Sequence, residues 1–240
     1  MQSLGKYLIP GQKLSPQSLA DYYSKNAQDS HAGFAANDWG EPEEMLAQFE
    51  FLVEHVDLNG KTLLDVGAGN GLLFDFLAKR NIKPASITAI DISSGQIAVI
   101  REQYPEVHAI EGDFFTYEFE QTYDVITMFG VAPCLKFIFP QKHRLSSLLR
   151  LLDRALQYST FGVAWSFLNH NCYERAEEEG YEYVYYYPEE VCTILSGARY
   201  DLSTVLNDLV TSCFIYSEDA NESTFRFNLN RIDEKLGLLK

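Results

Sequence analysis

The chain has 240 residues, 46% of them apolar and 22% charged, and its 34 acidic against 19 basic side chains give a formal net charge of −15. This length favours one globular domain, and the negative charge argues against a nucleic-acid-binding surface, because such surfaces depend on Lys and Arg. No stretch resembles a signal peptide or is apolar enough to span a membrane, and the cysteines and histidines follow no metal-binding pattern. We therefore expect a soluble, cytoplasmic protein with no metal site.

The first part of the chain, residues 1–57, is expected to form a helical lid. A short amphipathic helix should begin near Ser15 and Pro16, since proline is favoured in the first turn of a helix. A longer helix is predicted over residues 42–56, where apolar residues recur at spacings of three and four.

Residues 58–168 alternate between short apolar runs and helical segments. The runs predict strands over residues 62–66, 86–92, 107–110, 123–129 and 161–167, and the segments between them predict helices over residues 72–80, 95–104 and 145–156. Such alternation is typical of βαβ units that build a parallel sheet covered on both faces. We assign this region as a ligand-binding core.

The pattern changes in residues 169–240. An acidic and aromatic stretch, 173–187, is followed by a short helix from Pro188, and then by strand-like segments at 209–217 and 224–229. We expect these last two segments to pair as an antiparallel hairpin, which would make the sheet mixed. Because no linker or internal repeat interrupts the chain, residues 1–240 are interpreted as one domain.

A glycine-rich turn and two acids are the most informative features. The turn is LLDVGAGNG (63–71), a strand that runs into a helix, and its glycines permit positive φ and close approach of a ligand. Asp91 and Asp113 follow the next two predicted strands. Taken alone, Asp91 could cap a helix and Asp113 could be a solvated turn residue. In order at successive strand ends, however, they predict a nucleoside site, with Asp91 on the ribose hydroxyls.

The spacing of the glycines distinguishes between the known classes of nucleotide-binding turn. A dinucleotide fingerprint reads G-x-G-x-x-G, whereas Leu72 follows the third glycine here, and no Gly-Lys-Ser/Thr sequence indicates a P-loop. The chain resembles the class I S-adenosylmethionine-dependent methyltransferases in LLDVGAGNG (63–71), AIDIS (89–93), EGDFF (111–115) and YDVITMFGV (123–131).

The resemblance implies a Rossmann-like three-layer α/β sandwich with a mostly parallel seven-stranded sheet and a C-terminal antiparallel hairpin. It also implies that Asp65 and the glycine turn hold the methionine part of S-adenosylmethionine, that Ile92 and Phe114 contact the adenine, and that Phe129 lines the donor-methyl side. The full set of implied cofactor residues is Asp65, Gly67, Ala68, Gly69, Gly71, Asp91, Ile92, Gly112, Asp113, Phe114, Phe129 and Gly130.

Catalytic residues are not identified by the sequence. Methyl transfer from a sulfonium relies mainly on alignment of the reactants, so a general base is required only if the acceptor must lose a proton during attack. His170 and Tyr173 are candidates for such a base, and the tyrosine-rich stretch 181–187 is interpreted either as a cage for a cation or as an edge strand. Candidate substrate residues are Tyr22, Tyr23, Trp39, Val131 and Asn169.

The sequence thus predicts an S-adenosylmethionine-dependent methyltransferase that acts on a small molecule. A non-catalytic methyltransferase-fold binding or regulatory module is the main alternative, and a nicotinamide-dependent oxidoreductase is disfavoured by Leu72. The acceptor, the atom that receives the methyl group and the oligomeric state are left open.

Overall fold

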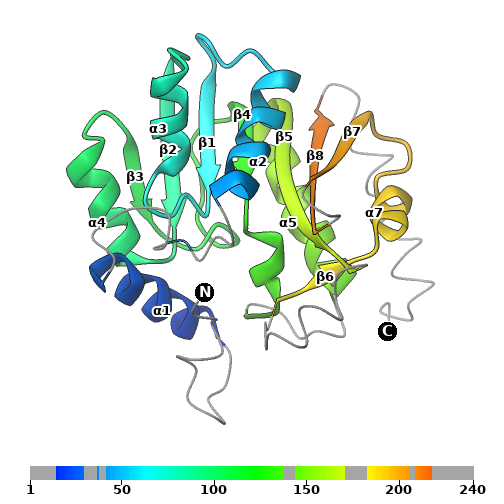
Figure 1. The fold of residues 1–240 in the computed structure, drawn as a ribbon, viewed down its shortest axis with the longest axis horizontal. Helices are drawn as coiled ribbons and strands as arrows, with labels where there is room; N and C mark the ends of the chain where they lie inside the picture. The colour runs from blue at the N-terminus through cyan, green and yellow to red at the C-terminus, as the bar shows by residue number, and fades with distance from the viewer. Residues whose placement is uncertain are drawn as a thin grey trace.

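The computed structural model describes residues 15–29, 37, 42–137, 144–170, 183–205 and 209–217. In this part of the chain one sheet has eight strands, in the order β3-β2-β1-β4-β5-β8-β7 with β6 beside β5 (Figure 1). The strands are β1 (Thr62–Val66), β2 (Ser86–Asp91), β3 (His108–Glu111), β4 (Tyr123–Met128), β5 (Ser159–Asn169), β6 (Tyr185–Tyr186), β7 (Tyr200–Val205) and β8 (Val210–Tyr216). The helices are α1 (Pro16–Asp29), α2 (Pro42–His55), α3 (Leu72–Lys79), α4 (Ser94–Gln103), the 3-10 helix η3 (Ala132–Phe137), α5 (Arg144–Tyr158) and α7 (Pro188–Ile194).

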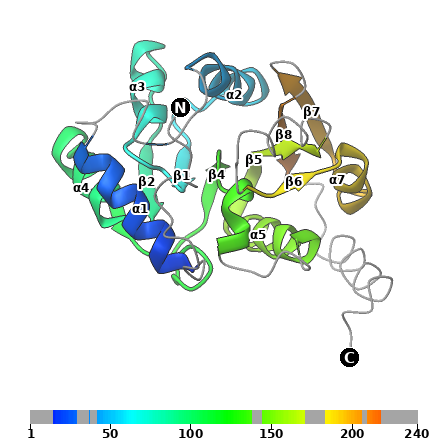
Figure 2. The same ribbon diagram turned by 60° about the horizontal axis from the view of Figure 1, so that its bottom comes forward.

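The predicted three-layer sandwich is confirmed by the way in which the strands divide their side chains. Leu63 of β1 packs with the buried side chains of α2, α3 and α4. Its neighbour Leu64 packs on the other face, with those of α5 and α7. Successive side chains of a strand point to opposite faces, so a strand that is apolar at every position must be covered on both. Figure 2 shows α2 and α3 on one side of the sheet and α5 on the other.

The central strands are parallel, and this places their carboxyl ends along one edge. β1 pairs in parallel with β2 and with β4, and β2 pairs in parallel with β3. In Figure 1 these ends point toward the lower edge of the sheet, where α1 lies. Loops that follow β1, β2 and β3 therefore meet at this edge, as the ligand-binding interpretation requires.

The antiparallel part of the sheet differs from the expected hairpin. β8 pairs antiparallel with β5 on one edge and with β7 on the other, so its hairpin partner is residues 200–205. The expected pairing of residues 209–217 with residues 224–229 is therefore wrong, because both edges of β8 are already occupied. Residues 224–229 themselves lie outside the described part of the chain.

Helix α1 is held against α4 by a close backbone contact. The Ser24 hydroxyl lies 3.0 Å from the Ser93 hydroxyl and accepts a hydrogen bond from the Gly95 amide at 3.3 Å. A Cβ added at Gly95 would lie 2.7 Å from the Ser24 backbone, so only glycine permits this approach. The predicted N-terminal helix thus packs beside the carboxyl ends of the strands, with Leu19 and Tyr23 facing the pocket described below.

Gly162 is a position where the core has no room for another carbon atom. A Cβ there would lie 2.5 Å from the ring of the fully buried Phe214 and 2.9 Å from the Ile215 carbonyl oxygen. We expect Gly162→Ala to lower the free energy of unfolding by about 1–3 kcal/mol, as overpacked cores do, and to lower the urea midpoint accordingly. The control is Gly112→Ala, whose added Cβ would meet its nearest neighbour at an ordinary 3.4 Å. Equal midpoints for the two variants would contradict the prediction.

Candidate functional site

The glycine turn between β1 and α3 is fixed by backbone hydrogen bonds to the neighbouring strand. The amides of Gly67 and Ala68 donate to the Ile90 carbonyl at 2.8 and 3.3 Å. Gly67 and Gly69 have φ values of +66° and +55°, a region that side chains rarely adopt. A Cβ at Gly67 would also lie 2.6 Å from Val131 Cγ2. The turn therefore needs glycine both for its conformation and for the space in front of it.

Asp65 is the next-to-last residue of β1 and carries a buried carboxyl group. Its Oδ1 accepts a hydrogen bond from the Thr127 hydroxyl of β4 at 2.6 Å. Burial raises the pKa of Asp65 to about 7, the Thr127 hydrogen bond acts against this rise, and the negative charge of Asp91 adds to it. A cation bound beside Asp65 would favour the ionised form and lower this pKa. The chemistry of the position thus fits a positively charged ligand group.

Asp91 connects the end of β2 to the glycine turn. One carboxylate oxygen accepts from the Gly69 amide at 2.9 Å, and the other accepts from the Ser93 amide at 2.8 Å. Burial raises the pKa of Asp91, while these backbone hydrogen bonds oppose the rise. The alternative interpretation of Asp91 as a helix cap is wrong, because the N-cap of α4 is Ser93, whose side chain accepts from the Gln96 amide.

Asp113 and Phe114 follow β3 and complete the row of strand ends. Asp113 Oδ1 accepts from the Phe115 amide at 2.9 Å, which fixes the turn. Phe114 is buried, and its ring lies 5.6 Å from the guanidinium carbon of Arg154. The alternative that Asp113 is only a solvated turn residue is incomplete, since Asp113 is also part of a pocket wall.

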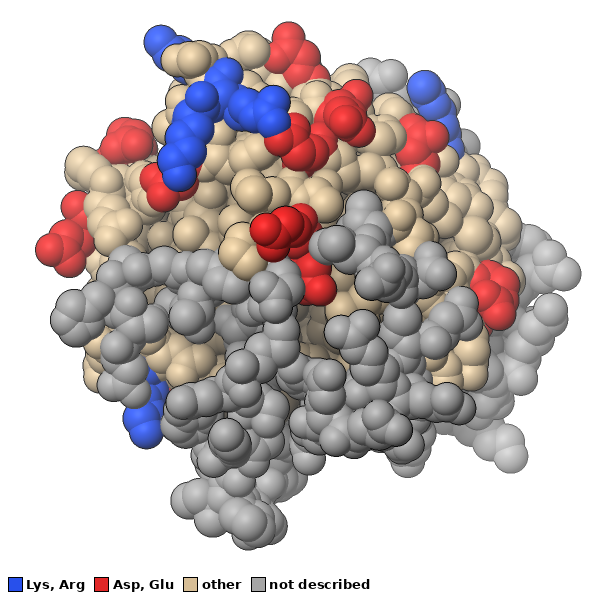
Figure 3. All heavy atoms as spheres, viewed as in Figure 1, with Lys and Arg blue, Asp and Glu red and all other residues tan. Residues whose placement is uncertain are grey.

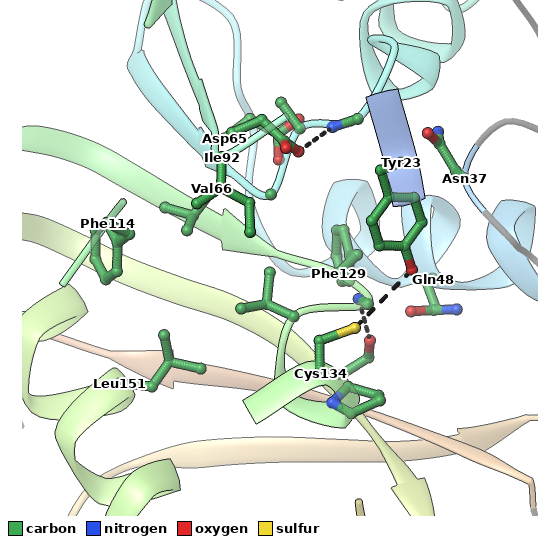
Figure 4. A pocket seen from close by; sticks show the side chains of 18 of the residues that line it. Tyr23, Asn37, Gln48, Asp65, Val66, Ile92, Phe114, Phe129, Cys134 and Leu151 are labelled. Carbon is green, nitrogen blue, oxygen red and sulfur yellow. Dashed lines mark hydrogen bonds between the residues drawn. The ribbon is translucent and has the colours of Figure 1, made fainter. Parts of the chain in front are cut away.

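These strand ends meet in one pocket with a volume of about 500 Å³. Figure 4 shows Asp65, Val66 and Ile92 at one side of it, with Phe114 and Leu151 at another. Every expected cofactor residue except Gly71 is part of its wall: Asp65, Gly67, Ala68, Gly69, Asp91, Ile92, Gly112, Asp113, Phe114, Phe129 and Gly130. Gly71 instead precedes α3 as its N-cap with φ +85°, and a Cβ there would lie 2.8 Å from the rings of Phe74 and Tyr104.

The expected substrate and catalytic residues are only partly brought to this pocket. Tyr23 and Val131 line it. Tyr22 is not part of the wall, and it packs in a small apolar cluster with Leu19, Cys134 and Phe137. Asn169 is buried and donates its backbone amide to Leu209.

Of the two candidate bases, His170 lies in the described part of the chain and does not line the pocket. The His170 ring is stacked on the Tyr187 ring, with centroids 3.9 Å apart, and is not part of the wall. Tyr173 and the substrate candidate Trp39 lie outside the described residues. Of the tyrosine-rich stretch, Tyr183 and Tyr185 line the pocket.

The sequence analysis missed the part of the wall that comes from α2 and from the far end of the chain. The missed residues include Leu19, Asn37, Glu44, Gln48, Phe49, Leu151, Ser166, Phe167 and Val210. One signal was present for Gln48, because it is the polar member of an otherwise apolar buried face, with Met45, Phe49 and Leu52. Leu19, Phe49, Leu151, Phe167 and Val210 are apolar residues that the sequence does not distinguish from core. The polar residues Asn37, Glu44 and Ser166 belong to no motif that would mark them as site residues.

The charged side chains give no indication of a nucleic-acid surface on the face shown in Figure 3. Lys and Arg lie mainly along its upper edge and alternate with Asp and Glu, and acidic side chains stand near its centre. Within the described ranges, no helix has the length and apolarity needed to cross a bilayer. In the same ranges, no three His, Cys, Asp or Glu side chains are grouped so as to hold a metal ion.

Comparison with known proteins gives the same fold. A family model described as a methyltransferase domain matches residues 63–157. Malonyl-acyl-carrier-protein O-methyltransferase of Priestia megaterium is 31% identical over 119 residues, which cover 49% of this chain and 43% of that protein. The chain spans less than half the length of the curated relatives it matches.

Two solved structures illustrate the likeness of the fold. The magnesium protoporphyrin IX methyltransferase of Synechocystis PCC 6803, with bound S-adenosylhomocysteine, aligns with a TM-score of 0.60 and 15% identity over 84% of this chain and 98% of that one. The N-methyltransferase NodS of Bradyrhizobium japonicum aligns with a TM-score of 0.58 and 13% identity over 82% of this chain and 98% of that one. At such identities the likeness concerns the fold alone.

Proposed function

We propose that the chain is a class I S-adenosylmethionine-dependent methyltransferase that transfers a methyl group from S-adenosylmethionine to a small-molecule acceptor. The match of residues 63–157 to the methyltransferase-domain model and the 31% identity to an O-methyltransferase over 119 residues support this proposal. The observation that carries this proposal is the convergence of Asp65, Asp91 and Asp113 with the glycine turn on one pocket. No described feature favours the oxidoreductase alternative.

The residues present fit the adenosyl cofactor. Asp91 already accepts one backbone hydrogen bond on each oxygen, and a carboxylate oxygen can accept a further bond from a ribose hydroxyl. Asp113 and Phe114 line the same pocket, and we assign them to the edge and the face of the adenine. Asp65 provides the buried carboxyl group that a cationic ligand group needs.

Bound S-adenosylmethionine supplies an electrophilic methyl group on a positively charged sulfur. The contribution of the protein is to hold the acceptor in line with that methyl group and to exclude water, which raises the effective concentration of the reactants. Phe129 and Gly130 line the same pocket as the glycine turn, and the Gly130 amide is held by a hydrogen bond to the Ser166 hydroxyl at 3.3 Å. Among the described lining residues there is no histidine, so the proposed mechanism uses positioning and no histidine base.

A small acceptor is supported by the shape of the site. The pocket has the volume of ordinary small-molecule sites, and part of its wall is built from apolar and aromatic side chains beyond those assigned to the cofactor. The named acceptors of similar proteins include malonyl-acyl-carrier protein and magnesium protoporphyrin IX, so the family likeness alone does not define the acceptor of this chain.

Titration calorimetry tests the proposal. We expect S-adenosylhomocysteine and S-adenosylmethionine to bind with micromolar or smaller Kd, and NAD to bind more weakly by at least about a hundredfold, because the turn lacks the dinucleotide spacing. Tighter binding of NAD would contradict the proposal. Binding of S-adenosylhomocysteine without turnover of any amine, phenol or carboxylate would instead favour the non-catalytic module.

A further inference from the structure

The charge of the pocket restricts the acceptor. Its described wall carries four acidic side chains, Glu44, Asp65, Asp91 and Asp113, and no Lys, Arg or His. Carboxylates concentrated in a partly enclosed site repel anions and attract cations. An acceptor with a carboxylate or phosphate group would find no basic partner among these described lining residues.

The part of the wall beyond the cofactor residues is largely apolar. It is formed by α1, α2, η3, β5 and the segments near β6 and β8, and includes Leu19, Tyr23, Phe49, Pro133, Phe167 and Tyr183. Figure 4 shows the rings of Tyr23 and Phe129 in this region, with Gln48 below Tyr23 in the view. Aromatic faces bind apolar groups and also stabilise a nearby positive charge.

Gln48 places one unused hydrogen-bond acceptor in this apolar wall. Its side chain is fully buried, and Nε2 donates to the Glu44 carbonyl at 3.1 Å. Oε1 accepts no hydrogen bond from the described residues. Because an unpaired buried oxygen is costly, the position is suited to a ligand that brings an N–H or O–H donor.

We propose that the methyl acceptor is an apolar amine, and that Gln48 Oε1 orients it by accepting a hydrogen bond from its N–H group. This inference rests on the proposed methyltransferase function and specifies its substrate class. Gln48 is a binding residue for the acceptor, and its amide needs no change of protonation during the reaction.

The chemistry of an amine matches the charge of the site at each stage. The amine enters the acidic pocket as an ammonium ion and releases one proton to solvent before the reaction. The nitrogen lone pair of the resulting neutral amine forms a bond to the methyl carbon while the carbon–sulfur bond breaks, and that bonding pair stays on sulfur. The positive charge moves from sulfur to nitrogen, and the methylated ammonium later releases a proton to solvent. The site thus surrounds a cation throughout, whereas transfer to a carboxylate or phenolate would first require an anion among four acidic side chains.

Matched pairs of small molecules test this inference on the intact protein saturated with S-adenosylhomocysteine. We expect 2-phenylethylamine and tryptamine to bind at least about tenfold more tightly than 3-phenylpropanoate and indole-3-propanoate, by calorimetry. With S-adenosylmethionine, mass spectrometry should detect the N-methylated amines. Equal binding of each pair, tighter binding of the carboxylates or no binding of either would overturn the inference.

Substitution of Gln48 separates a role at the acceptor from a role at the cofactor. Gln48→Leu, which keeps the size and removes the oxygen, should weaken amine binding about tenfold, the effect of one lost hydrogen bond, and leave the Kd of S-adenosylhomocysteine unchanged. Glu54→Gln, on the exposed side of the same helix, should change neither value.

Unchanged amine binding in Gln48→Leu, or an equal loss of cofactor binding, would overturn the assignment of Gln48. The comparison of amines with carboxylates on the unsubstituted protein stands independently of how that variant folds. Failure of the protein to bind S-adenosylhomocysteine at all would overturn the proposed function as well, so the two failures are distinguishable.

Discussion

Asp65→Asn is expected to stabilise the ligand-free protein at neutral and alkaline pH. The folded-state pKa of Asp65 is raised from 3.8 to about 7 by burial, so ionisation of this carboxyl group opposes folding. The contribution of protonated Asp65 to the free energy of unfolding is fully present below pH 4 and is lost as the pH rises from about 4 through about 7. At about 1.4 kcal/mol per pKa unit, the upper bound of the loss is about 4 kcal/mol.

The asparagine variant avoids this loss because its amide oxygen still accepts from Thr127 and never ionises. Thermal unfolding of the ligand-free protein should therefore show a Tm several degrees higher than that of the unsubstituted protein at pH 8 and the same Tm at pH 4. Binding of S-adenosylmethionine should be weakened strongly, since the buried negative charge is lost. A variant that binds S-adenosylmethionine normally would contradict the role of Asp65.

Asp124→Asn is the control of opposite sign. Hydrogen bonds from the Thr62 amide and hydroxyl lower the pKa of Asp124, so its ionised form stabilises the fold above the unfolded-state pKa, and this contribution is lost as the pH falls through the folded-state pKa. Its replacement should lower the Tm at pH 8 and leave cofactor binding intact. Opposite shifts of Tm for the two variants would show that burial, and not a general effect of removing negative charge, determines the result at Asp65.

Asp91→Ala is expected to weaken the binding of S-adenosylhomocysteine by about a hundredfold or more. The substitution removes the carboxylate proposed to accept from the ribose hydroxyls, and hydrogen bonds to a charged group are stronger than average. It also removes the acceptor for the Gly69 and Ser93 amides, so the glycine turn loses its connection to β2. Calorimetric titration with S-adenosylhomocysteine measures the loss.

Two further variants define the origin of this loss. Asp91→Asn keeps one acceptor oxygen and should bind with intermediate affinity. Glu111→Ala removes an exposed acid at the end of β3, directly beside Asp91 in the sheet register, and should leave the Kd unchanged. A similar loss in Glu111→Ala and Asp91→Ala would indicate a general effect of charge and contradict the specific role of Asp91.

The parallel part of the sheet and its helices were predictable because their sequence signals are local. The alternation of short apolar runs with helices predicted β1 to β5 and the helices α3, α4 and α5 to within a few residues, since a strand buried on both faces must be apolar at nearly every position. The 3-10 helix η3 after β4 was not predicted. The glycines of the turn after β1 were also readable, because positive φ and close packing favour that residue type.

The C-terminal pairing was not predictable from such signals. Residues 209–217 have the composition of a strand, and the sequence does not state whether the partner precedes or follows them. β5 pairs with one edge of β8, so only the other edge is open to a hairpin partner, and β7 occupies it. Whether β7 or residues 224–229 would pair there depends on the position of each segment relative to that edge. That choice is a property of the assembled sheet.

The sequence by itself determined the class of fold, the row of acids at successive strand ends and the glycine turn between them, because each is fixed by neighbours along the chain. Only the tertiary structure decided which other residues line the pocket. Gln48, Phe167 and Val210 come from elements far apart in the sequence, and they meet because the helices and strands that carry them pack around one cavity. The energetic effect of burying a polar group depends on whether its surroundings offer a hydrogen-bond partner, and those surroundings are supplied by distant parts of the chain.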